Sequence, residues 1–273
     1  MITKQAYAKI NLTLEVGGKR EDGYHSLTSV MARITLADRV TVSKNTTGDI
    51  SFTSTDKTIP QDENLCTKAA MAYFDAMGIS GGVDISLENN IPTASGMGGG
   101  SADAAAVIEC LEELYGRLDG AVRHKIARGL GADVPYCLKV SPCLCTGIGD
   151  ECRELKCSAL DGLWLVVSKV GEKLSTGKVY SDFDALEKGS ETYDHSAVVN
   201  ALSNGDVYAL AGSVFNDFER VVLPSSPEVV AERERLMAGG ALNVVMSGAG
   251  PTLIAFFDDE EKASECGCVY KML

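Results

Sequence analysis

The segment IPTASGMGGGSADAAAVI, residues 91–108, constrains the fold more than any other part of this sequence. Glycine weakens helices and strands, yet Gly96, Gly98, Gly99 and Gly100 stand directly before an alanine-rich run that predicts a helix. The start of a helix has unpaired N–H groups and the positive end of the helix dipole, and both favour an anion. Because glycines let the backbone approach that anion closely, the segment predicts a phosphate-binding loop that leads into a helix.

Two common phosphate-binding motifs do not fit this loop. No Gly-Lys-Ser/Thr follows, which excludes a P-loop, and Ser101 stands where the dinucleotide motif G-x-G-x-x-G has its last glycine. The alternative without a binding function is a flexible loop in which Ser101 is the N-cap of the helix.

The predicted first strand, residues 6–16, alternates strictly between apolar and polar residues. Lys9 and Asn11 therefore project from one face, about 6–7 Å apart along the strand, and are able to address one substrate group together. The alternative is an ordinary solvated face of a surface strand.

Two later motifs are hard to explain as scaffold alone. In GADVPY, residues 131–136, Asp133 follows a predicted helix and precedes Pro135, where the chain cannot continue as a helix. In MSGAGPTLIAFF, residues 246–257, two glycines form the turn of a predicted hairpin. A turn aspartate and a purely structural hairpin are the alternatives.

Strands and helices alternate along the whole chain, which predicts an α+β architecture in two lobes. Strands are expected at 6–16, 27–43, 83–88 and 162–169, helices at 63–77, 101–115, 119–129, 195–203 and 227–238, and a strand-turn-strand at 241–257, followed by a short helix. The lobe boundary is expected near 150–160, so that residues 1–155 form the first lobe and 156–273 the second.

Composition narrows the class of protein. The 273 residues are 45% hydrophobic and 23% charged, without a signal segment or an apolar run long enough to cross a membrane, so we expect a cytoplasmic globular protein. A formal net charge of −13 without a basic run argues against nucleic acid. The nine cysteines are expected to be buried thiols rather than disulfides, and Cys143, Cys145, Cys152 and Cys157 lack the paired spacing of a zinc site.

Taken together, these motifs resemble the GHMP kinase superfamily over nearly the whole chain. The stretches that carry the resemblance are AYAKINLTLEV (6–16), GKREDGYHSL (18–27), SGMGGGSADAAA (95–106), GADVPY (131–136) and MSGAGPT (246–252). The combination of AKINL, DGYH and GADVP is similar to the branch that phosphorylates a cytidine-diphosphate-linked methylerythritol, and differs from mevalonate and homoserine kinases. The resemblance implies a two-lobed GHMP kinase fold, with an N-terminal lobe like ribosomal protein S5 and a ferredoxin-like C-terminal lobe.

The resemblance also implies roles for individual residues. Asp133 is the expected general base, and Lys9 is the cation that holds this carboxylate in its charged form and stabilises negative charge during transfer. The residues expected to hold the phosphates of ATP are Pro92, Gly96, Gly98, Gly99, Gly100 and Ser101. The residues expected to hold the substrate are Asn11 at the methylerythritol end, Tyr24 and Tyr180 on the faces of the cytosine, His25 at its edge, and Thr176.

ATP and Mg²⁺ are the expected cofactors of a monomer or weak homodimer that binds neither nucleic acid nor membrane. Three departures from the family pattern are Gly177 in place of a proline, Ala102 in place of a serine, and PCLCTG (142–147) in place of a Gly/Ala-rich stretch. The second departure leaves the magnesium ligands unassigned. The segment NDFE (216–219) is interpreted as structural. A different GHMP small-molecule kinase and a non-catalytic nucleotide-binding regulator remain as alternatives.

Overall fold

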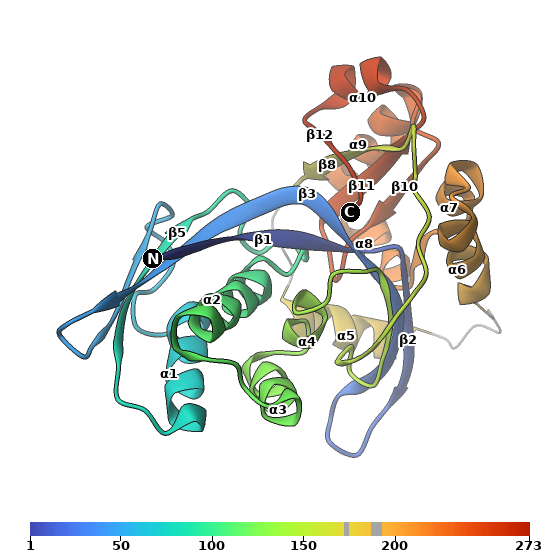
Figure 1. Cartoon of the computed structure of the whole chain (residues 1–273). Coiled ribbons are helices and arrows are strands. Elements are labelled where there is room, and N and C mark those ends of the chain that lie inside the picture. Colours follow the sequence, from blue (N-terminus) through green and yellow to red (C-terminus); the bar gives the residue numbers. More distant parts are fainter. Residues whose placement is uncertain (172–174, 187–192) are drawn as a thin grey trace. The chain divides into compact units, whose positions relative to one another are not determined.

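The computed structural model describes residues 1–171, 175–186 and 193–273 (Figure 1). The chain forms two compact units that are built from interleaved segments. Unit 1 comprises Met1–Lys9, Leu36–Thr93 and Gly98–Lys139, and unit 2 comprises Ile10–Thr35, Ala94–Met97 and Val140–Leu273. Two long strands, β1 (Ile2–Asn11) and β3 (His25–Asn45), contribute residues to both units. The lobe boundary near residue 155 stays a prediction.

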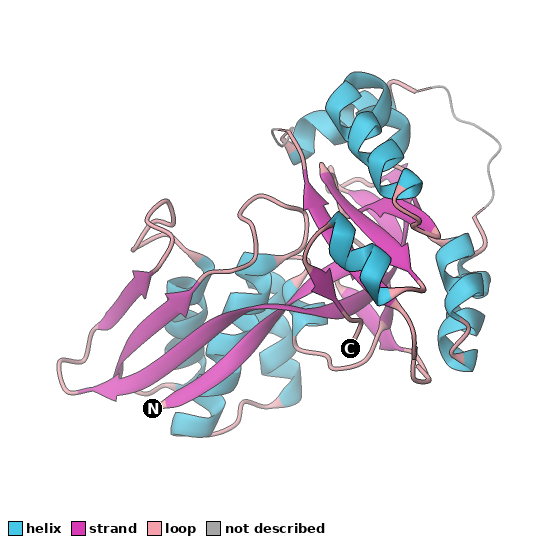
Figure 2. Cartoon of the chain, turned by 90° about the horizontal axis from the view of Figure 1, so that it is seen from above, coloured by secondary structure: helices cyan, strands magenta, loops and turns pink. Residues whose placement is uncertain are grey.

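Unit 1 combines strands with a layer of helices. Its further elements are β4 (Ile50–Ser54), β5 (Gly82–Glu88), α1 (Leu65–Met77), α2 (Gly99–Tyr115), α3 (Gly120–Leu130) and α4 (Val134–Cys137). Strand β5 pairs antiparallel with residues 39–45 of β3 and parallel with β4. Helices α1, α2 and α3 lie on one face of these strands (Figures 1 and 2).

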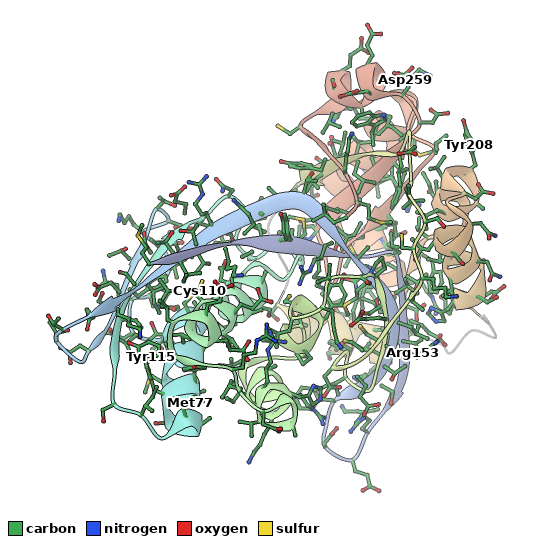
Figure 3. The ribbon with its side chains drawn as sticks, viewed as in Figure 1. Met77, Cys110, Tyr115, Arg153, Tyr208 and Asp259 are labelled. Carbon is green, nitrogen blue, oxygen red and sulfur yellow. The ribbon has the colours of Figure 1, made fainter. Side chains whose placement is uncertain are left out.

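The core of unit 1 lies between this sheet and the helices. Strand β5 follows the two-residue period of a strand with one buried face, because Val83, Ile85 and Leu87 are buried and the residues between them are exposed. Helix α2 buries mainly small side chains, among them Ala102 and residues 104–106, which allows close packing against α1. Near the end of α2, Tyr115 (labelled in Figure 3) meets Phe74 of α1 edge-to-face at 5.2 Å between ring centroids.

Local capping explains where the helices of unit 1 begin. Helix α1 begins after Asn64, whose side chain accepts a hydrogen bond from Thr67 N at 2.9 Å. Helix α2 begins two residues earlier than the sequence predicts, because Gly98 is its N-cap. Ser101 is therefore the third residue of α2, and the alternative in which it caps the helix is wrong.

Unit 2 contains a four-stranded antiparallel sheet in the order β10-β11-β8-β12. The strands of unit 2 as a whole are β2 (Thr13–Lys19), β6 (Cys143–Thr146), β7 (Glu151–Glu154), β8 (Trp164–Lys169), β9 (Phe215–Asn216), β10 (Asn243–Met246), β11 (Thr252–Phe257) and β12 (Val269–Tyr270). Its helices are α5 (Thr176–Asp184), α6 (His195–Asn204), α7 (Val207–Ser213), α8 (Glu219–Ser225), α9 (Pro227–Ala238) and α10 (Glu260–Cys266). All six residues of β11 are buried, so this strand lies in the middle of the hydrophobic core of the unit.

The mixed α+β architecture is confirmed, and so is the hairpin predicted over residues 241–257. Strands β10 and β11 pair antiparallel, and the turn between them contains Gly248 and Gly250, both with positive φ. The single strand predicted over 6–16 is wrong, because β1 ends at Asn11 and β2 begins at Thr13. The stretch 27–43 belongs to one continuous strand, β3.

No helix within the described ranges has both the length and the apolar composition to cross a membrane. None of the nine cysteines, all of which lie in the described part of the chain, forms a disulfide, and five of them are buried. Cys145 and Cys152 face each other across the β6-β7 hairpin, with their sulfur atoms 2.8 Å apart. Outside residues 172–174 and 187–192, no group of three or more His, Cys, Asp or Glu side chains is placed to hold a metal ion.

The Asn216 side chain fixes the turn between β10 and β11, which supports the structural interpretation of NDFE. Its Nδ2 donates to Met246 O at 2.6 Å and to Gly248 O at 2.8 Å, and its Oδ1 accepts from Phe218 N at 2.9 Å. The neighbouring Asp217 accepts from Val16 N at 2.7 Å.

Replacing Asn216 with alanine is expected to lower the free energy of unfolding by about 1–3 kcal/mol, because buried carbonyl groups lose their donors. Urea denaturation of Asn216→Ala and the parent measures this loss. Asn200→Ala, at an exposed position of α6, is the matched control and is expected to stay within about 0.5 kcal/mol of the parent. A loss at Asn216 no larger than that of the control contradicts the prediction.

Candidate active site

Unit 1 brings together the two charged residues expected to do the chemistry. Lys9 lies near the end of β1, and Asp133 stands directly before α4. Lys9 Nζ and Asp133 Oδ2 are 3.5 Å apart, and the two side chains are 5% and 31% exposed. A buried ammonium group needs a partner of opposite charge, and Asp133 provides it while keeping one side open to solvent. The solvated face considered for Lys9 is therefore wrong.

The glycines of the loop make room for this ion pair. Gly98 has φ 68°, and a Cβ on it would lie 2.9 Å from Lys9 Cγ and 3.6 Å from Asp133 Oδ2. A Cβ on Gly99 would lie 3.2 Å from Ile91 Cγ2. The aliphatic part of the Lys9 side chain therefore packs directly against the backbone of Gly98. This packing is a second reason for a glycine at this position, in addition to the close approach of an anion.

The start of α2 has the features of an anion site. No side chain caps it, and no acidic residue lies in its first turn, so its first N–H groups are open to a ligand. Gly100 is exposed, whereas Pro92, Gly98, Gly99 and Ser101 are half-buried. Ser101 Oγ lies 3.8 Å from the position of a Cβ on Gly131, so the loop and the GADVPY motif are neighbours in unit 1. These residues fit a phosphate group.

In unit 2, Gly96 packs against the turn that follows β10. Gly96 has φ 76°, and a Cβ on it would lie 2.5 Å from Ser247 O, while a Cβ on Gly248 would lie 2.9 Å from Gly96 O. Asn11, which is 1% exposed, is held between the same turn and β3. Its Oδ1 accepts from Gly248 N at 3.1 Å, and its Nδ2 donates to Ser29 Oγ at 2.8 Å.

The predicted substrate residues Tyr24, His25, Thr176 and Tyr180 line one pocket of unit 2, with a volume of about 390 Å³. The strip 174–184 that supplies two of them begins at Leu174, which lies outside the described residues, and its described part is helix α5 with its N-cap. Tyr24 is 62% exposed at the rim, and His25 is buried. The rings of His25 and Tyr180 are stacked, with centroids 4.9 Å apart.

Two charged residues of this pocket have no counterpart in the sequence predictions, Lys19 and Asp184. Asp184 accepts a hydrogen bond from His25 Nε2 at 2.7 Å, and Lys19 Nζ lies 3.7 Å from its other oxygen. These residues come from β2 and from the end of α5, and only the folded chain shows that they meet.

A buried pair of carboxyl groups, Asp38 and Asp103, lies beneath the phosphate loop in unit 1. Asp38 Oδ1 accepts from Asn90 N at 2.5 Å and Ile91 N at 2.7 Å, which fixes the chain just before Pro92. Burial, followed by the nearby charge of Asp38, raises the pKa of Asp103 well above its usual range, and its carboxyl group shares a hydrogen bond with Asp38. The raised pKa favours the protonated form of Asp103, which can donate this hydrogen bond to Asp38.

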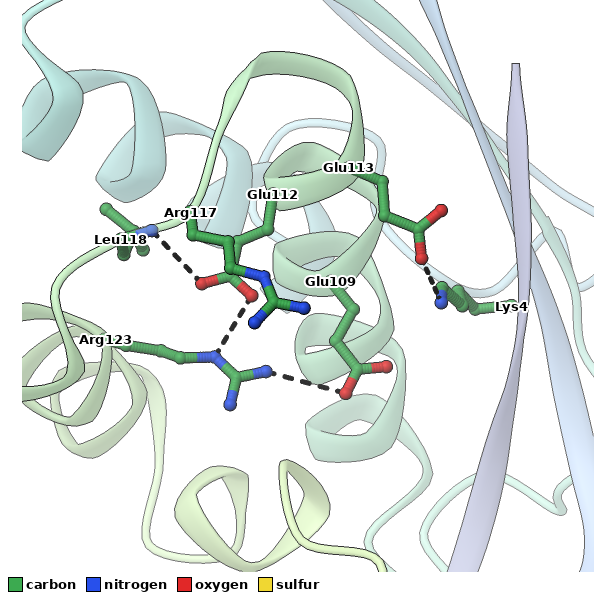
Figure 4. A pocket seen from close by; sticks show the side chains of 7 residues that line it. All are labelled: Lys4, Glu109, Glu112, Glu113, Arg117, Leu118 and Arg123. Carbon is green, nitrogen blue, oxygen red and sulfur yellow. Dashed lines mark hydrogen bonds and ion pairs between the residues drawn. The ribbon is translucent and has the colours of Figure 1, made fainter.

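A second pocket of unit 1, with a volume of about 410 Å³, has charged walls (Figure 4). Its acids and bases pair with one another: Lys4 with Glu113, and Arg123 with Glu109 at 3.5 Å and with Glu112 at 3.3 Å. Its charges are largely balanced within the protein, so the pocket points to no particular ligand.

Comparison with known proteins places the chain in a class. Residues 64–139 match the model of the GHMP kinases N terminal domain, and residues 198–268 match that of the GHMP kinases C terminal region. The two matches cover more than half of the chain, so it is a kinase with the GHMP fold, and this fold confirms the predicted α+β class. Kinases of this class depend on ATP.

The 4-diphosphocytidyl-2-C-methyl-D-erythritol kinase of Clostridium novyi (strain NT) is 39% identical over 268 residues, which cover 96% of this chain and 93% of that protein. A crystal structure of 4-(cytidine 5'-diphospho)-2C-methyl-D-erythritol kinase matches with a TM-score of 0.82 and 32% identity, over 97% of this chain and 93% of that one. The chain belongs to the 4-diphosphocytidyl-2-C-methyl-D-erythritol kinase family. Homoserine kinase from Cytophaga hutchinsonii, at 17% identity and a TM-score of 0.71 over 100% of this chain and 93% of that one, shares the fold alone.

Placing a methyl group on Gly98 is expected to lower both stability and kinase activity. The left-handed backbone costs about 1–2 kcal/mol for a residue with a Cβ, and the methyl group also displaces Lys9 from Asp133. Urea denaturation and steady-state kinetics of Gly98→Ala measure both effects. Gly120→Ala, where a Cβ at the start of α3 meets nothing within 4 Å, is the control and is expected to be neutral or stabilising. Wild-type activity in Gly98→Ala contradicts the packing argument.

The retained proton of Asp103 predicts a dependence of stability on pH. In the unfolded chain an aspartate loses its proton near pH 3.9, at about its reference pKa, whereas folded Asp103 keeps the proton to higher pH. Folding then takes up a proton at pH values between the unfolded and the folded pKa, so this group makes the parent less stable as the pH rises through that range.

Asp103→Asn imitates the protonated acid and removes this dependence. The variant is therefore expected to gain stability relative to the parent between pH 5 and pH 8, as measured by urea unfolding at several pH values. Asp75→Asn, at an exposed position of α1, is the control and is expected to show no such change. A difference between Asp103→Asn and the parent that is constant with pH contradicts a retained proton.

Proposed function

We propose that this chain transfers the γ-phosphoryl group of ATP to the 2-hydroxyl group of 4-diphosphocytidyl-2-C-methyl-D-erythritol, a step of non-mevalonate isoprenoid synthesis. The ion pair between Lys9 and Asp133 is the observation that carries this proposal. The names of the relatives, which span nearly the whole chain, support the substrate. The cytoplasmic location and the monomeric or weakly dimeric state stay predictions.

Asp133 accepts the proton of the substrate hydroxyl group as a general base. Its carboxylate is held by Lys9 on one side and is partly exposed on the other, as a base that must reach a bound substrate requires. Lys9 keeps this carboxylate oriented and supplies positive charge where negative charge develops during transfer. Phosphoryl transfer depends mainly on alignment and charge stabilisation, which are the two things that this pair offers.

The glycine-rich loop holds the phosphates of ATP. ATP supplies the phosphoryl group, and the first N–H groups of α2 bind its phosphate oxygens at the positive end of the helix dipole. Gly98, Gly99 and Gly100 leave no side chains in the way, Ser101 adds a hydroxyl group, and Pro92 and Gly96 flank the loop. Asp38 keeps the preceding segment in place through Asn90 and Ile91.

Mg²⁺ fits this loop without a cage of protein ligands. Magnesium in kinase sites keeps several waters and takes most of its other ligands from the substrate phosphates. The hydroxyl group of Ser101, in the first turn of α2, is the oxygen of the protein that we propose as a further ligand.

The pocket of unit 2 binds the cytosine end of the substrate. Tyr24 and Tyr180 offer aromatic faces, His25 offers a hydrogen-bonding edge, and Thr176 lies at the start of α5. Asn11, whose Oδ1 accepts from Gly248 N, is proposed to act at the methylerythritol end.

A substrate panel tests the proposed activity. With ATP and Mg²⁺, the protein is expected to phosphorylate 4-diphosphocytidyl-2-C-methyl-D-erythritol and to leave mevalonate and homoserine unchanged, as followed by ADP release and mass spectrometry of the product. Phosphorylation of a different alcohol instead identifies another GHMP kinase, and nucleotide binding without turnover identifies a regulator.

Asp133→Asn is expected to lower the single-turnover rate at saturating substrate by about 10²–10⁴-fold while substrate affinity is largely kept, because the amide preserves shape but cannot accept the proton. Lys9→Met is expected to lower the rate as well, since it removes the cation. Asp75→Asn, on the surface of α1, is the control with the same change of group.

A rate for Asp133→Asn within about threefold of the parent excludes the general-base role. Asp133 would then serve only to orient the hydroxyl group, which a loose transition state allows. Circular dichroism of each variant separates these outcomes from loss of folding.

A further inference from the structure

The edge of the base pocket is formed by a hydrogen bond between His25 and Asp184. His25 is the first residue of β3, and Asp184 is the last residue of α5. The Nε2 atom of His25 and the Oδ1 atom of Asp184 are 2.7 Å apart, and both residues line the pocket. His25 is 7% exposed and its ring is stacked on Tyr180, so neighbouring groups restrict its rotation.

Asp184 is ionised at neutral pH. Its hydrogen bond from His25, together with the nearby charge of Lys19, holds the pKa of its carboxyl group below the usual range. Lys19 Nζ lies 3.7 Å from its Oδ2 atom. Because an ionised carboxylate can only accept hydrogen bonds, the proton of this contact lies on His25 Nε2.

The position of this proton determines whether the other ring nitrogen, Nδ1, is a hydrogen-bond donor or an acceptor. In a neutral imidazole with its proton on Nε2, the Nδ1 atom is an acceptor. Within the described ranges the side chain of His25 makes no other hydrogen bond, so Nδ1 has no partner there, and His25 lines the pocket. An acceptor matches the exocyclic amino group of cytosine, whereas uracil carries a carbonyl oxygen, also an acceptor, at the same position.

We propose that Asp184 is a positioning residue that selects cytosine over uracil by holding His25 with its proton on Nε2. The inference rests on the proposed function, because it takes this pocket as the site of the pyrimidine. Without the carboxylate, the tautomer with its proton on Nδ1 becomes accessible, and that tautomer donates to the carbonyl group of uracil. The discrimination then falls because the tautomer of His25 changes.

The kinetic test compares two substrates that differ only in the base. The ratio of kcat/KM for the cytidine-diphosphate-linked substrate to that for its uridine analogue is measured for the parent and for Asp184→Asn. An asparagine accepts from Nε2 or donates to it, so both tautomers are allowed and the ratio is expected to fall by about tenfold, the effect of one mismatched hydrogen bond.

Asp182→Asn is the matched control, with the same substitution on the same helix. Asp182 pairs with Lys178 at 2.9 Å and does not line the pocket, so this variant is expected to keep the ratio of the parent. Asp184→Glu retains a carboxylate and is expected to recover part of the discrimination.

Nitrogen-15 NMR of the histidine rings reads the tautomer directly and does not depend on turnover. The chain has only three histidines, so His25→Gln identifies the signals of His25. The parent is expected to show a protonated Nε2 and an unprotonated Nδ1 at pH 8. In Asp184→Asn the two nitrogens are expected to move toward each other in chemical shift, and in Asp182→Asn to stay unchanged.

The two measurements separate the inference from the function on which it rests. If the parent turns over the cytidine substrate but Asp184→Asn keeps both its ratio and its tautomer, the role of Asp184 is overturned and the proposed function stands. A proton on Nδ1 in the parent also overturns that role. If the parent turns over neither substrate, the proposed function is wrong and the selection of cytosine is wrong with it.

Discussion

Polar side chains at buried positions are the constraint on which the rest of this structure depends. The first strand carries Lys9 and Asn11 into the interior, and Thr13 at the start of β2 is fully buried as well. A buried charge or amide is tolerated only if it finds a partner, and each of these does so within its own unit. Lys9 meets Asp133, Asn11 holds Ser29 and the backbone of Gly248, and the Thr13 hydroxyl group contacts His195 Nδ1 at 2.9 Å. One of these contacts, between Lys9 and Asp133, is the place at which the chemistry is proposed.

Elements with a strong local signal were predicted from the sequence, and short strands that depend on distant pairing alone were not. Helix α1 was expected at 63–77 and lies at Leu65–Met77. It could be predicted because its N-cap and its hydrophobic periodicity are both properties of a short continuous segment. The hairpin of β10 and β11 was found for the same reason. Strands β6 and β7 have four residues each and little periodicity of their own. They exist because β6 pairs with β3, far away in the sequence, and no local pattern reports that.

The residues of the candidate site also divide into those that have a signal in the sequence and those that do not. The motifs that resemble a known family pointed to Lys9 and Asp133, but spacing alone left each of them with a structural alternative. Asp38 was missed although a signal was present, since the alternation of Leu36, Asp38 and Val40 places a carboxyl group on the buried face of β3. Asp184 carried no such signal, because its partner His25 lies in a different part of the chain and the contact exists only after folding.

The contact between Gly96 and the turn at Gly248 has a consequence for how this family can vary. Each glycine lies where a Cβ would strike the backbone of the other segment, at 2.5 Å from Ser247 O and 2.9 Å from Gly96 O. When two side chains collide, a second mutation can shorten one of them and restore the fit. A collision with main-chain atoms offers nothing to shorten, so a mutation at either glycine has no single-residue suppressor on the opposite side. The two segments are thus expected to keep both glycines together through evolution, or to change only when the backbone of both is rebuilt.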